Sequence, residues 1–204
     1  VRAFNKLALE ADANDSVVVY YAGHGEVVPV NGVDVGYWLP ADVNPDEPKT
    51  WMSNSDIARM VAAIGARQML LVSDSCYSGT LVGSEKVQLD QRTDAAELLK
   101  RKAAVVLSSG GNEPVADEGR NGHSVFAWHF MRAMEALDQW QVGSNVFEQV
   151  RAAVVKDFPQ TPQYGASRTA GHQGNTDYLF ERREFEAVVP VPVRSPVPLT
   201  APKR

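Results

Sequence analysis

A histidine and a cysteine each follow a short apolar run in this sequence. His24 lies in the triplet Gly-His-Gly after SVVVYYA, and Cys76 lies in Asp-Ser-Cys after QMLLVS. An imidazole that takes the proton of a thiol turns the sulfur into a nucleophile, and backbone N–H groups can stabilise the oxyanion that forms on an attacked carbonyl. The two residues therefore predict nucleophilic catalysis, with Cys76 as the nucleophile and His24 as the acid and base.

The glycines beside the histidine bear on the same chemistry. A residue without a side chain leaves room for a substrate carbonyl to approach the backbone, so the amides of Gly25 and Cys76 are the candidate oxyanion hole. A third polar loop, which includes Glu113, follows the apolar run AAVVLS. We expect all three loops to meet at one place.

Structural roles are the alternative for each of these residues. Free cysteines are usually inert and buried, but Cys76 has Asp-Ser before it and Tyr-Ser-Gly after it, which predicts a polar turn. His24 could be purely structural, Asp74 could cap its own turn, and Glu113 could be a solvated loop charge. His172 is the rival imidazole in a glycine-rich loop, but no buried strand precedes it.

Apolar patterns along the chain predict the elements that position these residues. Continuous apolar runs at 16–22, 68–73 and 103–108 predict strands buried on both faces. Helical stripes follow at 2–11, 53–65, 93–102, 124–137 and 144–158, with Ser53 or Ser55, Thr93, Ser124 and Ser144 as caps. We expect loops with a hairpin at 26–52 and a last strand at 178–180. Alternating strands and helices predict an α/β sandwich with a mainly parallel sheet, whose strand ends gather the polar residues.

Length and composition limit the classes of protein. The chain has 204 residues, of which 44% are hydrophobic, enough for one domain with a sizeable core. A net charge of −5 argues against nucleic-acid binding, and the single cysteine excludes an intrachain disulfide and a Cys-rich zinc site. No apolar run is long enough to cross a bilayer. We place the domain at 1–181 and a proline-rich, extended tail at 182–204.

Two blocks of the sequence resemble the catalytic blocks of the caspase-like superfamily. These are VVVYYAGHG and LLVSDSCYSG, and the second is closer to the metacaspase, paracaspase and bacterial caspase-like form than to that of animal caspases. His24 precedes Cys76 by about 50 residues, the spacing found in caspases. The later segments SSGGNEPVAD, GHSVFAWHF, TPQYG and DYLF are also similar to bacterial members.

The resemblance implies a cysteine endopeptidase with a Cys76–His24 dyad and a thioester acyl-enzyme. It also implies that Asp74 lines the primary specificity pocket, and that Glu113 adds a second carboxylate, as in paracaspases. Acidic groups there favour a peptide or protein substrate with Arg or Lys before the cut, because Arg can form bidentate hydrogen bonds. Related enzymes cut themselves after the nucleophile strand, and here Lys86 and Arg92 are the candidate positions.

The family pattern differs from this chain at its start. The caspase-like fold begins with a strand and a helix that the sequence lacks, so a missing N-terminal segment of the same domain is an expected partner. The family also leaves calcium open as a cofactor, but no acidic ligand set can be matched to positions here. Two other functions remain open: a catalytically silent caspase-like scaffold or adaptor, and a different cysteine hydrolase.

Overall fold

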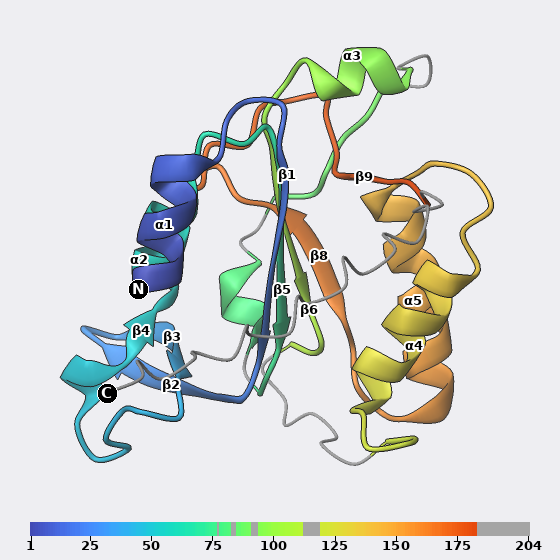
Figure 1. The fold of residues 1–204 in the computed structure, drawn as a ribbon. Coiled ribbons are helices and arrows are strands. Elements are labelled where there is room, and N and C mark those ends of the chain that lie inside the picture. The colour runs from blue at the N-terminus through green and yellow to red at the C-terminus, as the bar shows by residue number, and fades with distance from the viewer. Residues whose placement is uncertain (77, 83–84, 91–93, 112–118, 183–204) are drawn as a thin grey trace, which may run out of the picture.

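Four strands form the central sheet of the structure, a computed structural model that describes residues 1–76, 78–82, 85–90, 94–111 and 119–182 (Figure 1). Their order is β1-β5-β6-β8. Strands β1 (Ser16–Ala22), β5 (Gln68–Asp74) and β6 (Ala103–Ser108) are parallel, and β8 (Gln163–Ala166) is antiparallel to β6. The mainly parallel sheet that the sequence predicts is confirmed.

Helices cover both faces of this sheet, which gives the three layers of the predicted sandwich. Helices α1 (Arg2–Glu10) and α2 (Asn54–Ala62) lie on one side, and α4 (Val125–Glu135) and α5 (Gly143–Asp157) lie on the other (Figure 1). Each side has its own hydrophobic core against the sheet. The short helix α3 (Ala95–Leu99) lies beyond the end of the sheet where the parallel strands begin.

The helix caps agree with the sequence only in part. Ser53, not Ser55, caps α2, and Ser124 caps α4 as expected. The cap predicted for α5 is wrong: the helix begins before Ser144, whose N–H donates to the Asp177 carboxylate at 2.8 Å. The carboxylate of Asp177, from a distant segment, thus accepts a backbone N–H that has no partner within the first turn of α5. The helix predicted at 93–102 is reduced to α3, and its cap is Asp94.

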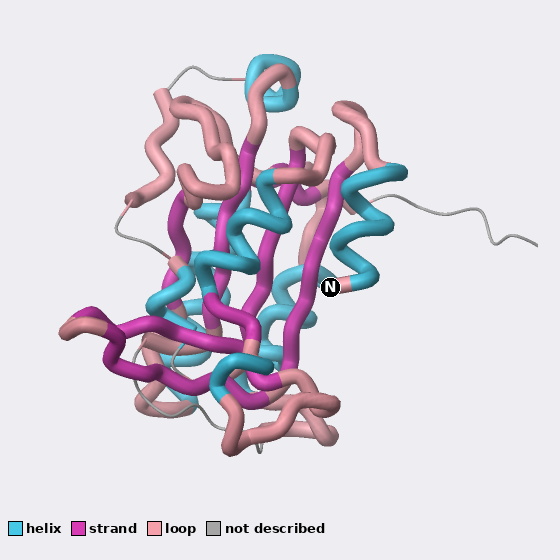
Figure 2. The backbone as a smooth tube through the Cα atoms, turned by 90° about the vertical axis from the view of Figure 1, so that its left-hand side faces the viewer, coloured by secondary structure: helices cyan, strands magenta, loops and turns pink. Residues whose placement is uncertain are grey.

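A small antiparallel sheet lies beside the main one (Figure 2). It contains β2 (His24–Val30), β3 (Val33–Leu39) and β4 (Met52–Ser53) in that order. The two residues between β2 and β3 are Asn31 and Gly32, with φ of 52° and 78°, the left-handed geometry that a two-residue hairpin requires. His24 follows β1 after one residue and begins β2. A 3-10 turn at Pro48–Thr50 precedes β4.

Burial separates the three parallel strands. All residues of β5 and β6 are buried, as their continuous apolar runs predict. For β1 the prediction is wrong, because it is an edge strand of the described sheet, and Val18 and Tyr20 are 49% and 42% exposed. A short pair, β7 (Gln141–Val142) with β9 (Leu179–Phe180), completes the described elements together with the 3-10 turn Ser78–Leu81. Residues 183–204 lie outside the described chain, so the predicted domain boundary and tail stay predictions.

Candidate active site

The carboxyl ends of β1 and β5 meet at one edge of the main sheet. The parallel register pairs Ala22 with Asp74, and the Gly23 N–H donates to the Asp74 carbonyl oxygen at 3.3 Å. His24 and Cys76 each lie two residues beyond this pair, so the two backbones carry them to the same edge. His24 is exposed, and Cys76 is a partly exposed free thiol. Both the thiol and the imidazole are thus accessible at this edge, and nucleophilic attack on a substrate requires both groups to be accessible.

The contact between β2 and the cysteine turn is made by Gly25. A methyl group built on Gly25 would lie 2.2 Å from the Cys76 carbonyl oxygen and 3.3 Å from Ser75 Oγ. Real Cβ atoms do not approach backbone oxygen so closely, so only glycine fits without a shift of the turn. The residue that follows His24 therefore packs directly against the backbone of Cys76.

Two aromatic rings fix the backbone at His24. The Tyr21 ring stacks on Trp38, with ring centroids 4.2 Å apart and planes inclined by 10°. The Tyr21 hydroxyl donates to the His24 carbonyl oxygen at 2.7 Å. Burial raises the pKa of Tyr21, so its hydroxyl remains protonated and able to donate over the neutral pH range.

A polar network lies under the cysteine turn. Trp38 Nε1 donates to Ser73 Oγ at 2.9 Å, and Ser73 Oγ lies 3.0 Å from Ser75 Oγ. From the neighbouring strand end, Ser109 Oγ donates to the Ser75 carbonyl oxygen at 3.4 Å, and Gln160 Nε2 donates to the Ser109 carbonyl oxygen at 2.6 Å. Sequence reasoning missed these residues, although serines at the ends of buried apolar runs are the signal that could have found them. Satisfied buried networks hold a turn in one conformation.

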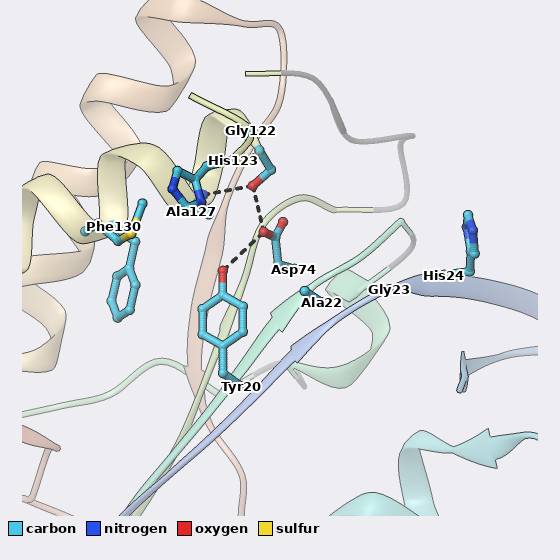
Figure 3. A pocket seen from close by; sticks show the side chains of 11 residues that line it. Tyr20, Ala22, Gly23, His24, Asp74, Gly122, His123, Ala127 and Phe130 are labelled. Carbon is cyan, nitrogen blue, oxygen red and sulfur yellow. Dashed lines mark hydrogen bonds between the residues drawn. The ribbon is translucent and has the colours of Figure 1, made fainter. Parts of the chain in front are cut away.

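The Asp74 side chain faces a pocket of about 500 Å³ on the other side of the strand ends (Figure 3). Its Oδ2 accepts hydrogen bonds from the Tyr20 hydroxyl at 3.1 Å and from Ser124 Oγ at 2.6 Å. Phe130 and Met131 supply apolar walls, and Asp74 is the one carboxylate among the described residues that line the pocket. The pKa of Tyr20 is raised, mainly by burial and then by the Asp74 charge, so its hydroxyl stays a donor.

The imidazoles in and near this pocket differ in position. Figure 3 shows the His24 ring standing apart from the Asp74 carboxylate, at the far end of the same pocket. His123 also lines the pocket, whereas His129 bonds Asp157 at 2.9 Å. The rival His172 accepts a hydrogen bond from the Ala104 N–H at 3.2 Å, where β6 begins. That is the opposite end of the sheet from Cys76.

The remaining predicted site residues lie elsewhere. Glu113 and Arg92 are outside the described residues, so the second pocket carboxylate and one candidate cutting position stay predictions. Lys86 is exposed and lies beside β8. Over the described part of the chain, no three His, Cys, Asp or Glu side chains gather as metal ligands would. Calcium as a cofactor stays a prediction. None of the described helices has the length and apolarity needed to span a membrane.

Comparison with known proteins adds an independent line of evidence. The chain is 33% identical to Metacaspase-4 of Arabidopsis thaliana over 100 residues, which covers 45% of this chain and 22% of that protein. It is 32% identical to Metacaspase-7 of the same plant over 99 residues, covering 45% of this chain and 23% of the relative. The match thus spans under a quarter of the length of these curated relatives.

A solved structure shows the same fold. The crystal structure of protein GSU0716 from Geobacter sulfurreducens aligns with a TM-score of 0.53 at 18% sequence identity, covering 86% of this chain and 77% of that one. The family described as Caspase domain matches residues 1–171, which include both strand ends of the candidate site. The chain therefore belongs to the caspase-domain family of cysteine peptidases.

Proposed function

We propose that this protein is a cysteine endopeptidase that cleaves peptide bonds after Arg or Lys. Cys76 is the nucleophile and His24 is the general acid and base. The observation that carries the proposal is the register of β1 and β5, which brings both residues to one sheet edge beside an acidic pocket. Family membership supports the reaction class.

The dyad performs the reaction in two steps. His24 takes the proton of the Cys76 thiol, and the thiolate attacks the scissile carbonyl carbon to form a tetrahedral intermediate. As this intermediate collapses, His24 gives its proton to the leaving amine, and a thioester remains on Cys76. Water, deprotonated by His24, then hydrolyses the thioester and restores the thiol.

The oxyanion is the charge that the site must stabilise in both steps. The amides of Cys76 and Gly25 are the proposed donors. The 2.2 Å approach of a Gly25 methyl to the Cys76 carbonyl oxygen supports this, because it means that the two backbones touch where the intermediate would form. Loss of one such donor costs about 100-fold to 1000-fold in rate in serine peptidases.

The pocket supports a basic residue before the cut. Asp74 offers a carboxylate that is only 9% exposed, and Phe130 and Met131 provide apolar surface for the methylene groups of Arg or Lys. Tyr20 and Ser124 both donate to Oδ2, so this carboxylate has a defined orientation. An acidic substrate side chain would face a like charge.

Hydrolysis of fluorogenic peptides that end in Arg, Lys or Asp tests the proposal. Cys76→Ala and His24→Ala variants are the controls, with circular dichroism to show that each variant is folded. We expect cleavage after Arg and Lys that both substitutions abolish. Cleavage after Asp alone would refute the pocket assignment. A folded protein with no activity would favour the catalytically silent scaffold.

A further inference from the structure

A buried amide at the start of β5 forms fewer hydrogen bonds than it can. Gln68 is 4% exposed, and its Oε1 accepts a hydrogen bond from the Leu179 N–H at 2.9 Å. Its Nε2 has no hydrogen-bond partner among the described residues. A buried donor without an acceptor is destabilising, because nothing replaces the hydration that it has lost. An acceptor oxygen brought to this amide would therefore be bound favourably.

Gln68 lines a hollow of about 570 Å³ at the end of the sheet opposite Cys76. Gln68 begins β5 and Ser16 begins β1, so the hollow is one strand length, about 20 Å, from the candidate active site. Helix α3 and strand β9, which also line it, lie at this end (Figure 1). Two of its side chains, Leu99 and Trp140, are apolar and 45% and 44% exposed. Exposed apolar surface beside an unpaired donor is the composition of a ligand site.

Trp140 also lines a second hollow, of about 910 Å³, beside β7 and the start of α5. Val142 and Ser144 form part of its wall. The two hollows thus share one exposed aromatic side chain, and we name them together the Trp140 groove. A ligand that fills both must be extended, because it has to pass the indole between them.

The charges on the Trp140 groove have one sign. Asp15 and Glu181 line the first hollow, and Glu148 lines the second. Among the described residues that line either hollow there is no Lys or Arg. The groove therefore favours a basic ligand, and the acceptor for Gln68 should be a neutral carbonyl oxygen and not a carboxylate.

One segment of this chain has the matching chemistry. Residues 187–204 contain five prolines and three basic residues, Arg194, Lys203 and Arg204, and no acidic residue. Proline removes a backbone N–H but keeps its carbonyl oxygen, and proline-rich segments bind grooves that are lined by aromatic side chains. Pro190 comes nine residues after Glu181, and nine residues span up to about 30 Å. The segment is thus attached at the edge of the groove with enough chain to turn back into it.

We propose that residues 187–204 bind in the Trp140 groove of their own chain. Proline and valine side chains pack on Trp140 and Leu99, a backbone carbonyl accepts from Gln68 Nε2, and the basic residues lie near the acidic rim. The attachment to β9 gives the segment an effective concentration of about millimolar, so contacts that are weak one by one are sufficient.

Nuclear magnetic resonance of the full-length chain tests this inference. A nitroxide is attached through Thr200→Cys in a Cys76→Ser background, because Cys76 is the single cysteine of the sequence. In the isotopically labelled chain, the indole N–H signal of Trp140 should broaden at least threefold more than that of Trp51, which contacts Tyr37 in the small sheet. Equal broadening of the two indole signals, or none, would overturn the inference.

Mixed samples distinguish the chain's own segment from that of a second copy. Labelled chain without nitroxide is mixed with unlabelled chain that carries it, and the Trp140 signal should stay sharp. Broadening in this mixture as strong as in the single chain would mean binding between copies and would reject the proposal. A synthetic peptide of residues 187–204, added above the effective concentration of about millimolar, should restore at least half of the Trp140 signal. A signal that the peptide leaves broadened would also reject it.

Side-chain variants of the same full-length chain test the contacts. Gln68→Glu keeps the oxygen that accepts from the Leu179 N–H and replaces the donor by a carboxylate oxygen. Leu99→Ala removes exposed apolar surface from the groove, and its matched control, Leu9→Ala, removes the same surface from α1, where Leu9 is 87% exposed. The first two substitutions should each reduce the broadening of Trp140 at least threefold, and the control should leave it unaltered. Undiminished broadening in Leu99→Ala would overturn the inference, whether or not Gln68→Glu folds.

Discussion

Neutralising Asp74 without changing its shape is the most direct probe of the pocket. In the Asp74→Asn variant the side-chain oxygen can still accept from Tyr20 and Ser124, which donate to Oδ2 at 3.1 and 2.6 Å. The local hydrogen bonds can therefore survive while the negative charge is lost. Asp74 is 9% exposed, so water does not replace the lost interaction with a bound Arg side chain.

The expected loss follows from this burial. Removing the charged partner of a desolvated, hydrogen-bonded pair costs about 2 to 4 kcal/mol. That is roughly a 30-fold to 1000-fold decrease in kcat/KM for an Arg substrate. A citrulline substrate has nearly the same shape as Arg but no charge, so its kcat/KM should stay within about threefold of the wild-type value.

The assay compares kcat/KM for the Arg and citrulline peptides in three proteins. These are the wild type, Asp74→Asn, and Asp138→Asn, whose carboxylate is exposed beyond the far end of α4. The ratio of Arg to citrulline should collapse only in Asp74→Asn. If both substrates lose the same factor, Asp74 acts on the fold or on the dyad and the pocket assignment is wrong. An unchanged ratio would exclude it as the cation partner.

Three other perturbations follow from the same contacts. Gly25→Ala should displace the Cys76 turn and lower kcat about 100-fold, because small misplacements of a catalytic group have effects of that size. Gly174→Ala, where a methyl group meets nothing within 4 Å, should have wild-type activity, and equal activity of the two variants would contradict the contact between Gly25 and Cys76. Ser124→Ala should raise KM for Arg peptides, and it should remove about 1 kcal/mol from the free energy of unfolding because the α4 cap is lost. Ser124→Thr should restore both KM and stability, whereas a change in stability alone would refute a role of Ser124 in the pocket. Burial lowers the pKa of His172 in the folded protein, so the unfolded state is protonated first as the pH falls. The neutral His172 side chain therefore contributes fully to stability above about pH 6.5, and this contribution is lost as the pH falls through the lower folded-state pKa. In urea unfolding at several pH values, His172→Asn should reduce this pH dependence of the free energy of unfolding.

The sequence predicts the strand ends that carry His24 and Cys76, because the relevant signals are local. Each apolar run ends in a polar turn, and parallel strands place such turns at one edge of a sheet. The runs at β5 and β6 become fully buried strands in direct register. The hairpin from β2 to β3 has a local signal too, since Asn-Gly between β-branched residues is the sequence of a two-residue turn. Its turn is at Asn31 and Gly32.

The partners of Asp74 could not be predicted in the same way. Tyr20 lies 54 residues before it and Ser124 lies 50 residues after it. Ser124 carries a clear local signal as a helix cap, and the structure confirms that role. Its second bond, to Asp74, depends on how α4 packs against the sheet, which no local pattern encodes. The same holds for Trp38, whose indole reaches Ser73 from a different sheet.

The run that forms β1 shows why a strand pattern does not define a site. Its apolar residues predict burial on both faces, yet burial alternates along the strand because β1 lies at the edge of the described sheet. A local pattern reports that a segment is extended and apolar, whereas burial depends on which elements pair with it and cover it. Tyr20 is the residue for which this matters most. It was expected in the core, but it is 42% exposed and its hydroxyl bonds the carboxylate of the pocket. The residue that the pattern assigns to packing thus forms a wall of the proposed specificity site.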